Sequence, residues 1–209
     1  MLWATSGLSA LIYWGLSLRD GHSWGRSAVK GLALVPLVAL ALWQDAPLVA
    51  LALALCSLGD VVLSRPGESA FLGGLVAFAL GHLGWIMVFA LRPGLDARYL
   101  TEPLSIVLLA GLAVLIVGVA RMILPRAGAL RLPVALYIGV IAAMSATAFA
   151  TGAGLITAGA VLFALSDAIL GLQTFFLTTG TRLERLANAL IWPLYWSAIA
   201  LLTLGALAA

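Results

Sequence analysis

Apolar residues dominate eight stretches of the chain, and charged or turn-forming residues separate them. The stretches cover roughly residues 2–18, 28–43, 47–64, 70–91, 103–124, 132–150, 153–178 and 186–207. Most are close to the ~20 residues that a helix needs to cross a bilayer. Hydrocarbon offers the backbone no hydrogen-bond partner, so each stretch is expected to be helical. The pattern predicts an all-α integral membrane protein with about eight transmembrane helices in a single polytopic domain, residues 1–209.

Two prolines fall inside these predicted helices, at Pro36 and Pro193. Proline has no amide hydrogen, and its ring clashes with the carbonyl four residues earlier. We therefore expect a local bend in the helix at each of the two positions.

The composition excludes a soluble globular protein. Hydrophobic residues make up 64% of the chain and charged residues 9%, against about 45–50% and about 25% in soluble domains. A net charge of +3 is too small and too scattered for nucleic-acid binding, so no nucleic acid is expected as a partner. Cys56 is the single cysteine, which excludes a disulfide framework, a zinc ribbon and a CxxC redox pair.

Basic residues gather in alternate loops. The first, third, fifth and seventh loops hold Arg19, Arg26, Lys30, Arg65, Arg121, Arg126, Arg131, Arg182 and Arg185. The loops between them hold only Arg92 and Arg98. Since cytoplasmic loops are rich in Lys and Arg, both termini are predicted to face away from the cytoplasm. The preference for Arg over Lys, with abundant Ala, Leu and Gly, is typical of a GC-rich bacterial genome. A bacterial inner membrane is therefore the expected cell membrane.

Two predicted helices share a phrase around an aspartate. Residues 57–63 read SLGDVVL and residues 164–170 read ALSDAIL. Asp167 therefore lies 107 residues after Asp60 (167 minus 60), which is close to half the chain.

The same offset carries Lys30 onto Tyr137. We interpret the pattern as a duplication of a four-helix unit, with repeats at residues 1–102 and 103–209. An even number of helices per unit makes the repeats parallel, related by an axis along the membrane normal. The alternative is coincidence in an apolar sequence of low diversity.

Two aspartates and a histidine fall inside apolar stretches. Asp167 and His82 lie near the middle of theirs, and Asp60 lies closer to an end. A charged carboxylate at the centre of a spanning helix costs ~2.5–3.5 kcal/mol, so such residues generally mark functional sites. The structural alternative is that they join helices through hydrogen bonds or ion pairs. By position, Asp167 is expected to be the deeper and more desolvated carboxylate.

Other polar residues border this predicted site. Lys30 and Arg26 lie at the predicted cytoplasmic edge of one helix, where they either hold a lipid phosphate or extend to the interface. The candidate hydrogen-bond donors to a polar cavity are Tyr137, Tyr195, Ser57 and Ser166. For each of these four taken alone, a structural role is the simpler interpretation.

Two carboxylates and a histidine can perform acid–base chemistry. A pair with one protonated and one ionised Asp suits hydrolysis through an oxocarbenium-like state. It also suits a proton-coupled transporter. The sequence lacks the ligand spacing of a zinc site, so no metal is predicted. It also lacks the nucleophile elbow of a serine hydrolase. No cofactor is predicted. The residues leave a hydrolase, a transporter and a structural or regulatory membrane protein open.

Three short motifs follow one another along the chain. They are SLGD at residues 57–60, Gly74-(x3)-Phe78-(x3)-His82, and GAVLFALSDAIL at residues 159–170. Together with Lys30, Tyr137 and Tyr195-Trp196, they resemble the YhhN-like lysoplasmalogenase family. The resemblance implies an eight-helix membrane enzyme that cleaves the vinyl ether bond of lysoplasmalogens. The products would be a fatty aldehyde and a glycerophospho head group.

Vinyl ether hydrolysis begins with proton delivery to the β-carbon, and the resulting oxocarbenium ion adds water. As a hypothesis, Asp167 donates this proton, and Asp60 stabilises the cation and activates the water. His82 is expected to orient a carboxyl group or the water.

The expected partners are a lysophospholipid substrate and the lipid bilayer. The head group is expected to point toward Lys30 and Arg26, and the expected substrate-binding residues are Lys30, Tyr137, Tyr195, Ser57 and Ser166. The alternative function is a proton-coupled transporter of lysolipids or another amphiphile, with the two aspartates as its relay. No oligomeric state is predicted.

Overall fold

The computed structural model describes residues 1–18 and 23–208. Its α-helices are α1 (Leu2–Ser17), α2 (Trp24–Leu32), α3 (Val35–Trp43), α4 (Pro47–Leu63), α5 (Glu68–Ala90), α6 (Pro103–Ile123), α7 (Arg131–Ala150), α8 (Gly154–Phe175) and α9 (Arg182–Leu207). Short 3-10 helices are η1 (Ala97–Thr101), η2 (Leu124–Arg126) and η3 (Gly128–Leu130). These two ranges contain no strand, so the all-α prediction is confirmed. Arg19, counted in the charge pattern, lies outside the described residues.

The predicted stretches correspond to these helices one by one, except that residues 28–43 become α2 and α3. Pro36 is the second residue of α3, and the carbonyl four residues before it belongs to Leu32, the last residue of α2. Proline cannot bond to that carbonyl, and in place of the expected bend the helix is interrupted between α2 and α3. Within the break, Ser6 Oγ of α1 donates to the Ala33 carbonyl at 2.6 Å. By contrast, α9 continues through Pro193.

Six stretches of the described chain are long and apolar enough to cross a membrane. They are Trp24–Trp43, Glu68–Ala90, Pro103–Arg126, Gly128–Ala150, Gly154–Phe175 and Arg182–Leu207. The apolar helix α4 has 17 residues, or about 26 Å at ~1.5 Å per residue, against a hydrocarbon core of ~30 Å. Helix α1 is shorter still, with 16 residues. Of the predicted spans, α1 and α4 therefore fall short in length, and the direction of the termini stays a prediction.

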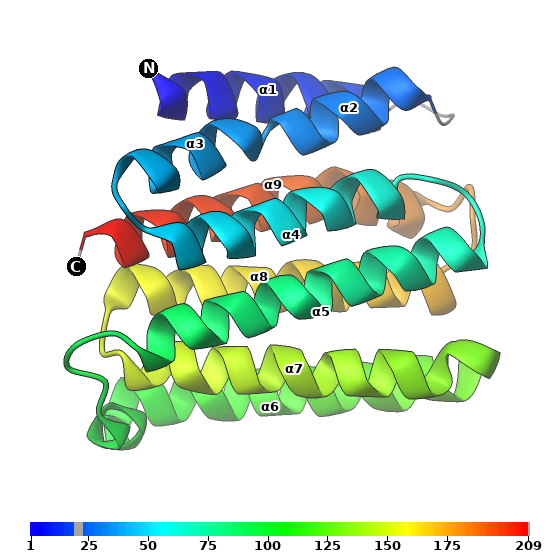
Figure 1. The fold of residues 1–209 in the computed structure, drawn as a ribbon. Helices are drawn as coiled ribbons and strands as arrows, with labels where there is room; N and C mark the ends of the chain where they lie inside the picture. The colour runs from blue at the N-terminus through cyan, green and yellow to red at the C-terminus, as the bar shows by residue number, and fades with distance from the viewer. Residues whose placement is uncertain (19–22, 209) are drawn as a thin grey trace. The chain divides into compact units, whose positions relative to one another are not determined.

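Packing divides the chain into two compact units, Met1–Trp85 and Ile86–Ala209, with the boundary inside α5. In the first unit, α1 contacts α2 and α3, which both contact α4. In the second unit, α6, α7 and α8 contact one another and α9 packs along α8 (Figure 1). The single polytopic domain and its two repeats stay predictions.

Glycines let α4 and the first part of α5 approach closely. A Cβ built on Gly59 would lie 2.8 Å from the Phe78 ring, and one built on Gly74 would lie 3.0 Å from the Leu63 backbone nitrogen. In lipid, where apolar side chains gain little by meeting each other, such close packing through small residues holds helices together. The helix that carries Asp60 is therefore packed directly against the one that carries His82.

Helices α8 and α9 meet through glycine in the same way. A Cβ on Gly159 would lie 2.8 Å from Leu202 Cγ and 3.0 Å from the Ala198 carbonyl oxygen. We expect Gly159→Ala to lower the free energy of unfolding by about 1–3 kcal/mol, because the backbone of α9 must move. Thermal unfolding in detergent measures the change. Gly118→Ala is the control, since nothing lies within 4 Å of its added Cβ. Equal Tm values for the two variants would contradict the prediction.

Candidate functional site

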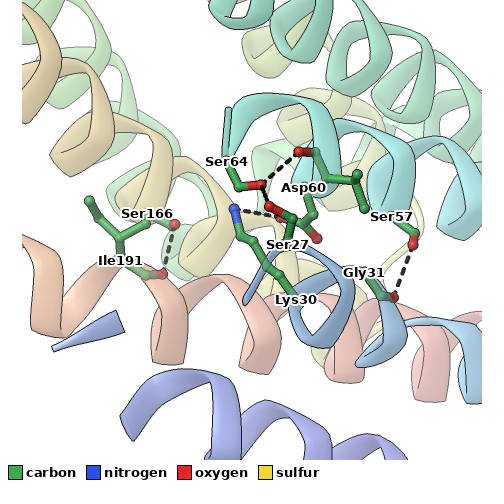
Figure 2. Close-up of polar contacts among 9 residues, drawn as sticks. Ser27, Lys30, Gly31, Ser57, Asp60, Ser64, Ser166 and Ile191 are labelled. Atoms are coloured by element: carbon green, nitrogen blue, oxygen red, sulfur yellow. Dashed lines mark hydrogen bonds and ion pairs between the residues drawn. The ribbon is translucent and has the colours of Figure 1, made fainter. Parts of the chain in front are cut away.

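Asp60 forms a buried ion pair with Lys30. The carboxylate lies in the last turn of α4 and is 1% exposed, and its Oδ1 is 3.0 Å from Lys30 Nζ in the last turn of α2 (Figure 2). The Lys30 ammonium also lies 5.8 Å from the centre of the Tyr13 ring of α1. Three helices of the first unit therefore surround this pair. A buried charge costs several kcal/mol unless it is paired, and here each ion provides the other's counter-charge.

Serine hydroxyls tie α2 to α4 on both sides of the ion pair. Ser57 Oγ donates to the Gly31 carbonyl at 3.0 Å, and Ser64 Oγ lies 2.6 Å from Ser27 Oγ (Figure 2). Ser27 Oγ in turn donates to the Ser23 carbonyl at 3.1 Å. The hydroxyl proton of Ser57, a predicted substrate-binding residue, is thus engaged in joining two helices.

His82 is fully buried on α5. Its Nδ1 is 2.7 Å from the Phe78 carbonyl oxygen, which assigns the ring proton to Nδ1 and makes Nε2 an acceptor. Phe78 is also the residue whose ring packs against Gly59. Phe78 therefore connects the backbone next to Asp60 with the imidazole of His82.

Asp167 of α8 accepts a hydrogen bond from a neutral donor. Tyr137 Oη of α7, 8% exposed, donates to Asp167 Oδ2 at 2.7 Å. Asp167 is half-buried, whereas Asp60 is almost completely enclosed. The protein itself therefore encloses Asp60 more than Asp167, while the expectation that Asp167 is the more desolvated carboxylate in the membrane stays a prediction. Its central position along α8 holds, but Lys30 and the helices around it enclose Asp60 more completely.

The remaining predicted residues of the second unit lie between α8 and α9. Ser166 Oγ donates to the Ile191 carbonyl at 3.0 Å (Figure 2). Tyr195 is 4% exposed, with its ring edge-on to Phe163 at 5.3 Å and 5.5 Å from Trp192. Ser166 therefore joins two helices, and Tyr195 belongs to an aromatic cluster.

Sequence reasoning missed a polar cluster one turn beyond the ion pair, formed by Ser27, Ser64, Arg65 and Trp24. Arg65 Nη1 lies 3.3 Å from Ser27 Oγ, and its guanidinium stands 4.2 Å from the centre of the Trp24 ring. The signal was the helical spacing, because residues three or four apart share a helix face. Ser27 precedes Lys30 by three positions, and Ser64 follows Asp60 by four. Within the described residues, no group of three His, Cys, Asp or Glu side chains is placed to hold a metal ion.

A model of the YhhN family matches residues 25–206. The chain belongs to the YhhN family. The match runs from α2 to the end of α9 and includes every residue of the candidate site from Lys30 to Tyr195. Family membership and the candidate spans together make the chain a multi-pass membrane protein.

A curated relative is the human protein named lysoplasmalogenase TMEM86B. It is 33% identical to this chain over 213 aligned positions, which cover 96% of this chain and 84% of the human protein. No solved structure matches the chain.

Proposed function

We propose that the protein hydrolyses the vinyl ether bond of lysoplasmalogens within the membrane, releasing a fatty aldehyde and a glycerophospho head group. The observation that carries this proposal is the 33% identity to human lysoplasmalogenase TMEM86B over nearly the whole chain. The chemistry of the site supports it, because acid-catalysed vinyl ether cleavage needs a proton donor and a group that stabilises a cation. Asp167 and Asp60 can supply these two functions.

The proposed duplication would make the two aspartates equivalent positions with different partners. The contacts Lys30–Asp60 and Tyr137–Asp167 are related by one offset of 107 residues (137 minus 30 and 167 minus 60). The same offset relates Trp24–Trp43 to Arg131–Ala150 (131 minus 24 and 150 minus 43). A side-chain contact that recurs at the same offset supports the duplication more strongly than the sequence likeness around the two aspartates does.

Lys30 and Tyr137 differ in charge, and the proposed roles of Asp60 and Asp167 follow from this difference. The Lys30 ammonium balances a negative charge on Asp60, so Asp60 suits stabilisation of the cation and acceptance of a proton from water. Tyr137 is neutral and donates to Asp167 Oδ2, so it supplies no positive charge that would hold Asp167 in its ionised form. Asp167 is therefore the proposed acid, on the basis of its neutral partner.

The proposed reaction returns both groups to their starting states. Asp167 delivers its proton to the β-carbon, and the oxocarbenium ion adds water as Asp60 takes the water's proton. Asp60 then returns that proton to the departing glycerol oxygen, while Asp167 removes the hydroxyl proton of the collapsing hemiacetal. His82 is the proposed positioning residue, through its Nε2 acceptor. The mechanism requires both carboxylates to reach one substrate.

The proposed substrate is a single-chain lysophospholipid that enters sideways from the bilayer. Tyr195 takes part by packing against Phe163 and Trp192 between α8 and α9, and Tyr137 contacts the acid. Ser57 and Ser166 take part by holding α4 against α2 and α8 against α9. Lys30 acts through Asp60.

The test is aldehyde release by purified protein in a maltoside detergent. We expect 1-alkenyl-glycerophosphocholine to yield aldehyde, whereas the saturated 1-alkyl ether, which cannot be protonated at carbon, yields none. Folded protein that releases no aldehyde would overturn the proposal. Proton-gradient-dependent movement of the lysolipid in sealed liposomes would then identify a transporter.

A further inference from the structure

Arg65 has different partners from Lys30 and Arg26, the other basic side chains described in the first unit. Lys30 is paired with Asp60, and the Arg26 guanidinium donates to the Leu16 backbone carbonyl. Within residues 1–18 and 23–208, the polar and aromatic partners of the Arg65 guanidinium are the Ser27 hydroxyl and the Trp24 ring. A guanidinium carries five N–H donors, and only one of them is engaged here, in a long bond of 3.3 Å.

The surroundings of Arg65 hold it in place. Its planar cation stacks on the indole of Trp24 at 4.2 Å, a contact that fixes orientation as well as adding stability. Ser27 is 2% exposed and is anchored by its bond to the Ser23 carbonyl. Ser64 has one hydroxyl proton, which points either to Ser27 Oγ at 2.6 Å or to the Val61 carbonyl at 2.7 Å. The serine pair thus presents oxygen to the guanidinium without neutralising it.

The position of Arg65 matches the depth of a lipid phosphate. Arg65 follows the end of α4 by two residues, and Trp24 opens the span Trp24–Trp43 with 72% of its surface exposed. Tryptophan at the end of a span lies at the level of the lipid head groups. Arginine is the side chain best suited to a phosphate group, because its fork of donors matches two phosphate oxygens.

We propose that Arg65, held by Trp24 and Ser27, binds the phosphate group of the lysolipid substrate. This inference rests on the proposed function and names the recognition element for its head group. It moves that role from Lys30 and Arg26, whose charged groups are engaged within the protein, to a residue one turn beyond the ion pair. The ligand class is a phosphodiester anion on a single-chain lipid.

Binding is measured without turnover, using 1-alkyl-glycerophosphocholine, whose saturated ether cannot be hydrolysed by this chemistry. Titration calorimetry in a maltoside detergent avoids competition from phosphocholine detergents. We expect Arg65→Gln to weaken binding roughly tenfold to a hundredfold, the equivalent of one charged hydrogen bond or two. Arg65→Lys is expected to recover only part of the affinity, because lysine lacks the fork and the stacking plane.

Arg126→Gln is the matched control. Arg126 also stacks on an aromatic ring, Phe176 at 4.8 Å, and donates to a backbone carbonyl, but it has no serine pair beside it. We expect the affinity of Arg126→Gln for 1-alkyl-glycerophosphocholine to stay within about twofold of wild type, because an exposed charge contributes little. Equal losses in Arg65→Gln and Arg126→Gln would overturn the proposal, since both arginines would then be acting only on bulk head groups.

Two further experiments distinguish a lipid phosphate from free phosphate, and a loss of phosphate binding from a structural effect of the substitution. With 1-alkenylglycerol, which lacks phosphate, Arg65→Gln should leave KM unchanged, while KM for 1-alkenyl-glycerophosphocholine rises. An equal rise for both substrates would indicate a structural role and overturn the proposal. Inorganic phosphate that binds wild type as tightly as the lysolipid would replace the lipid site by a free-anion site. If Arg65→Gln does not fold, the test uses wild-type protein alone. Equal affinities of wild type for 1-alkylglycerol and for 1-alkyl-glycerophosphocholine would then overturn the proposal, because the phosphate would contribute nothing to binding. The binding arms do not depend on aldehyde release.

Discussion

Replacing Asp167 by Asn is expected to lower kcat for vinyl ether cleavage by about 10²–10⁴-fold, the usual contribution of a general acid. The Asn side chain has nearly the same shape, and its carbonyl oxygen can still accept the 2.7 Å hydrogen bond from Tyr137. The fold should therefore persist while the proton is lost. Aldehyde release and thermal unfolding, measured on the same preparation, separate these two effects.

Asp96→Asn is the control for the Asp167 substitution. Asp96 is 47% exposed and accepts a bond from the Arg98 amide, which Asn can also accept. Its activity should match that of wild type. Tyr137→Phe should give a smaller fall in kcat, roughly tenfold for one hydrogen bond to a carboxyl group. Near-normal turnover in folded Asp167→Asn protein would contradict the proposed mechanism.

Asp60→Asn is expected to remove activity and also to lower the free energy of unfolding by about 3–5 kcal/mol. The loss of stability arises because Lys30 is only 14% exposed and its amino group would lose its counter-ion. A fall in Tm in detergent, relative to wild type and to Asp167→Asn, measures it.

Lys30→Met/Asp60→Asn distinguishes the chemical from the structural contribution of this pair. With both charges absent, more than half of the lost stability should return, since a buried ion pair can be replaced by neutral side chains at little cost. Activity should stay absent, because the double variant has no carboxylate at this position. Recovery of turnover in the double variant would show that Asp60 acts only as a structural partner of Lys30.

The positions of the helices could be predicted from the sequence because hydrocarbon leaves a spanning backbone no other choice. The interruption at Pro36 followed from the missing amide hydrogen of proline. The partners of the polar side chains could not be derived in the same way. Whether Ser57 faces a cavity or the Gly31 carbonyl depends on how α2 and α4 are rotated about their axes, and hydropathy does not specify that rotation.

The partners of Asp60 and Asp167 could not be predicted from the sequence either. The 107-residue offset related Lys30 to Tyr137 in the sequence, but the phrase alone did not indicate that each would contact the aspartate of its own unit. Sequence position along a helix also did not indicate that the protein would enclose Asp60 more completely than Asp167. The enclosure of Asp60 comes from neighbouring helices, whose contacts are set by tertiary packing.

The hydrogen bond from Ser6 to Ala33 gives α1 a role that its length does not suggest. An unbonded carbonyl surrounded by hydrocarbon costs several kcal/mol, and Ser6 meets that of Ala33 just beyond the turn that holds Lys30. Proteolytic removal of α1 would therefore leave the Ala33 carbonyl in the interrupted span without its partner. An affinity tag is therefore better placed after the last residue than in exchange for the first helix.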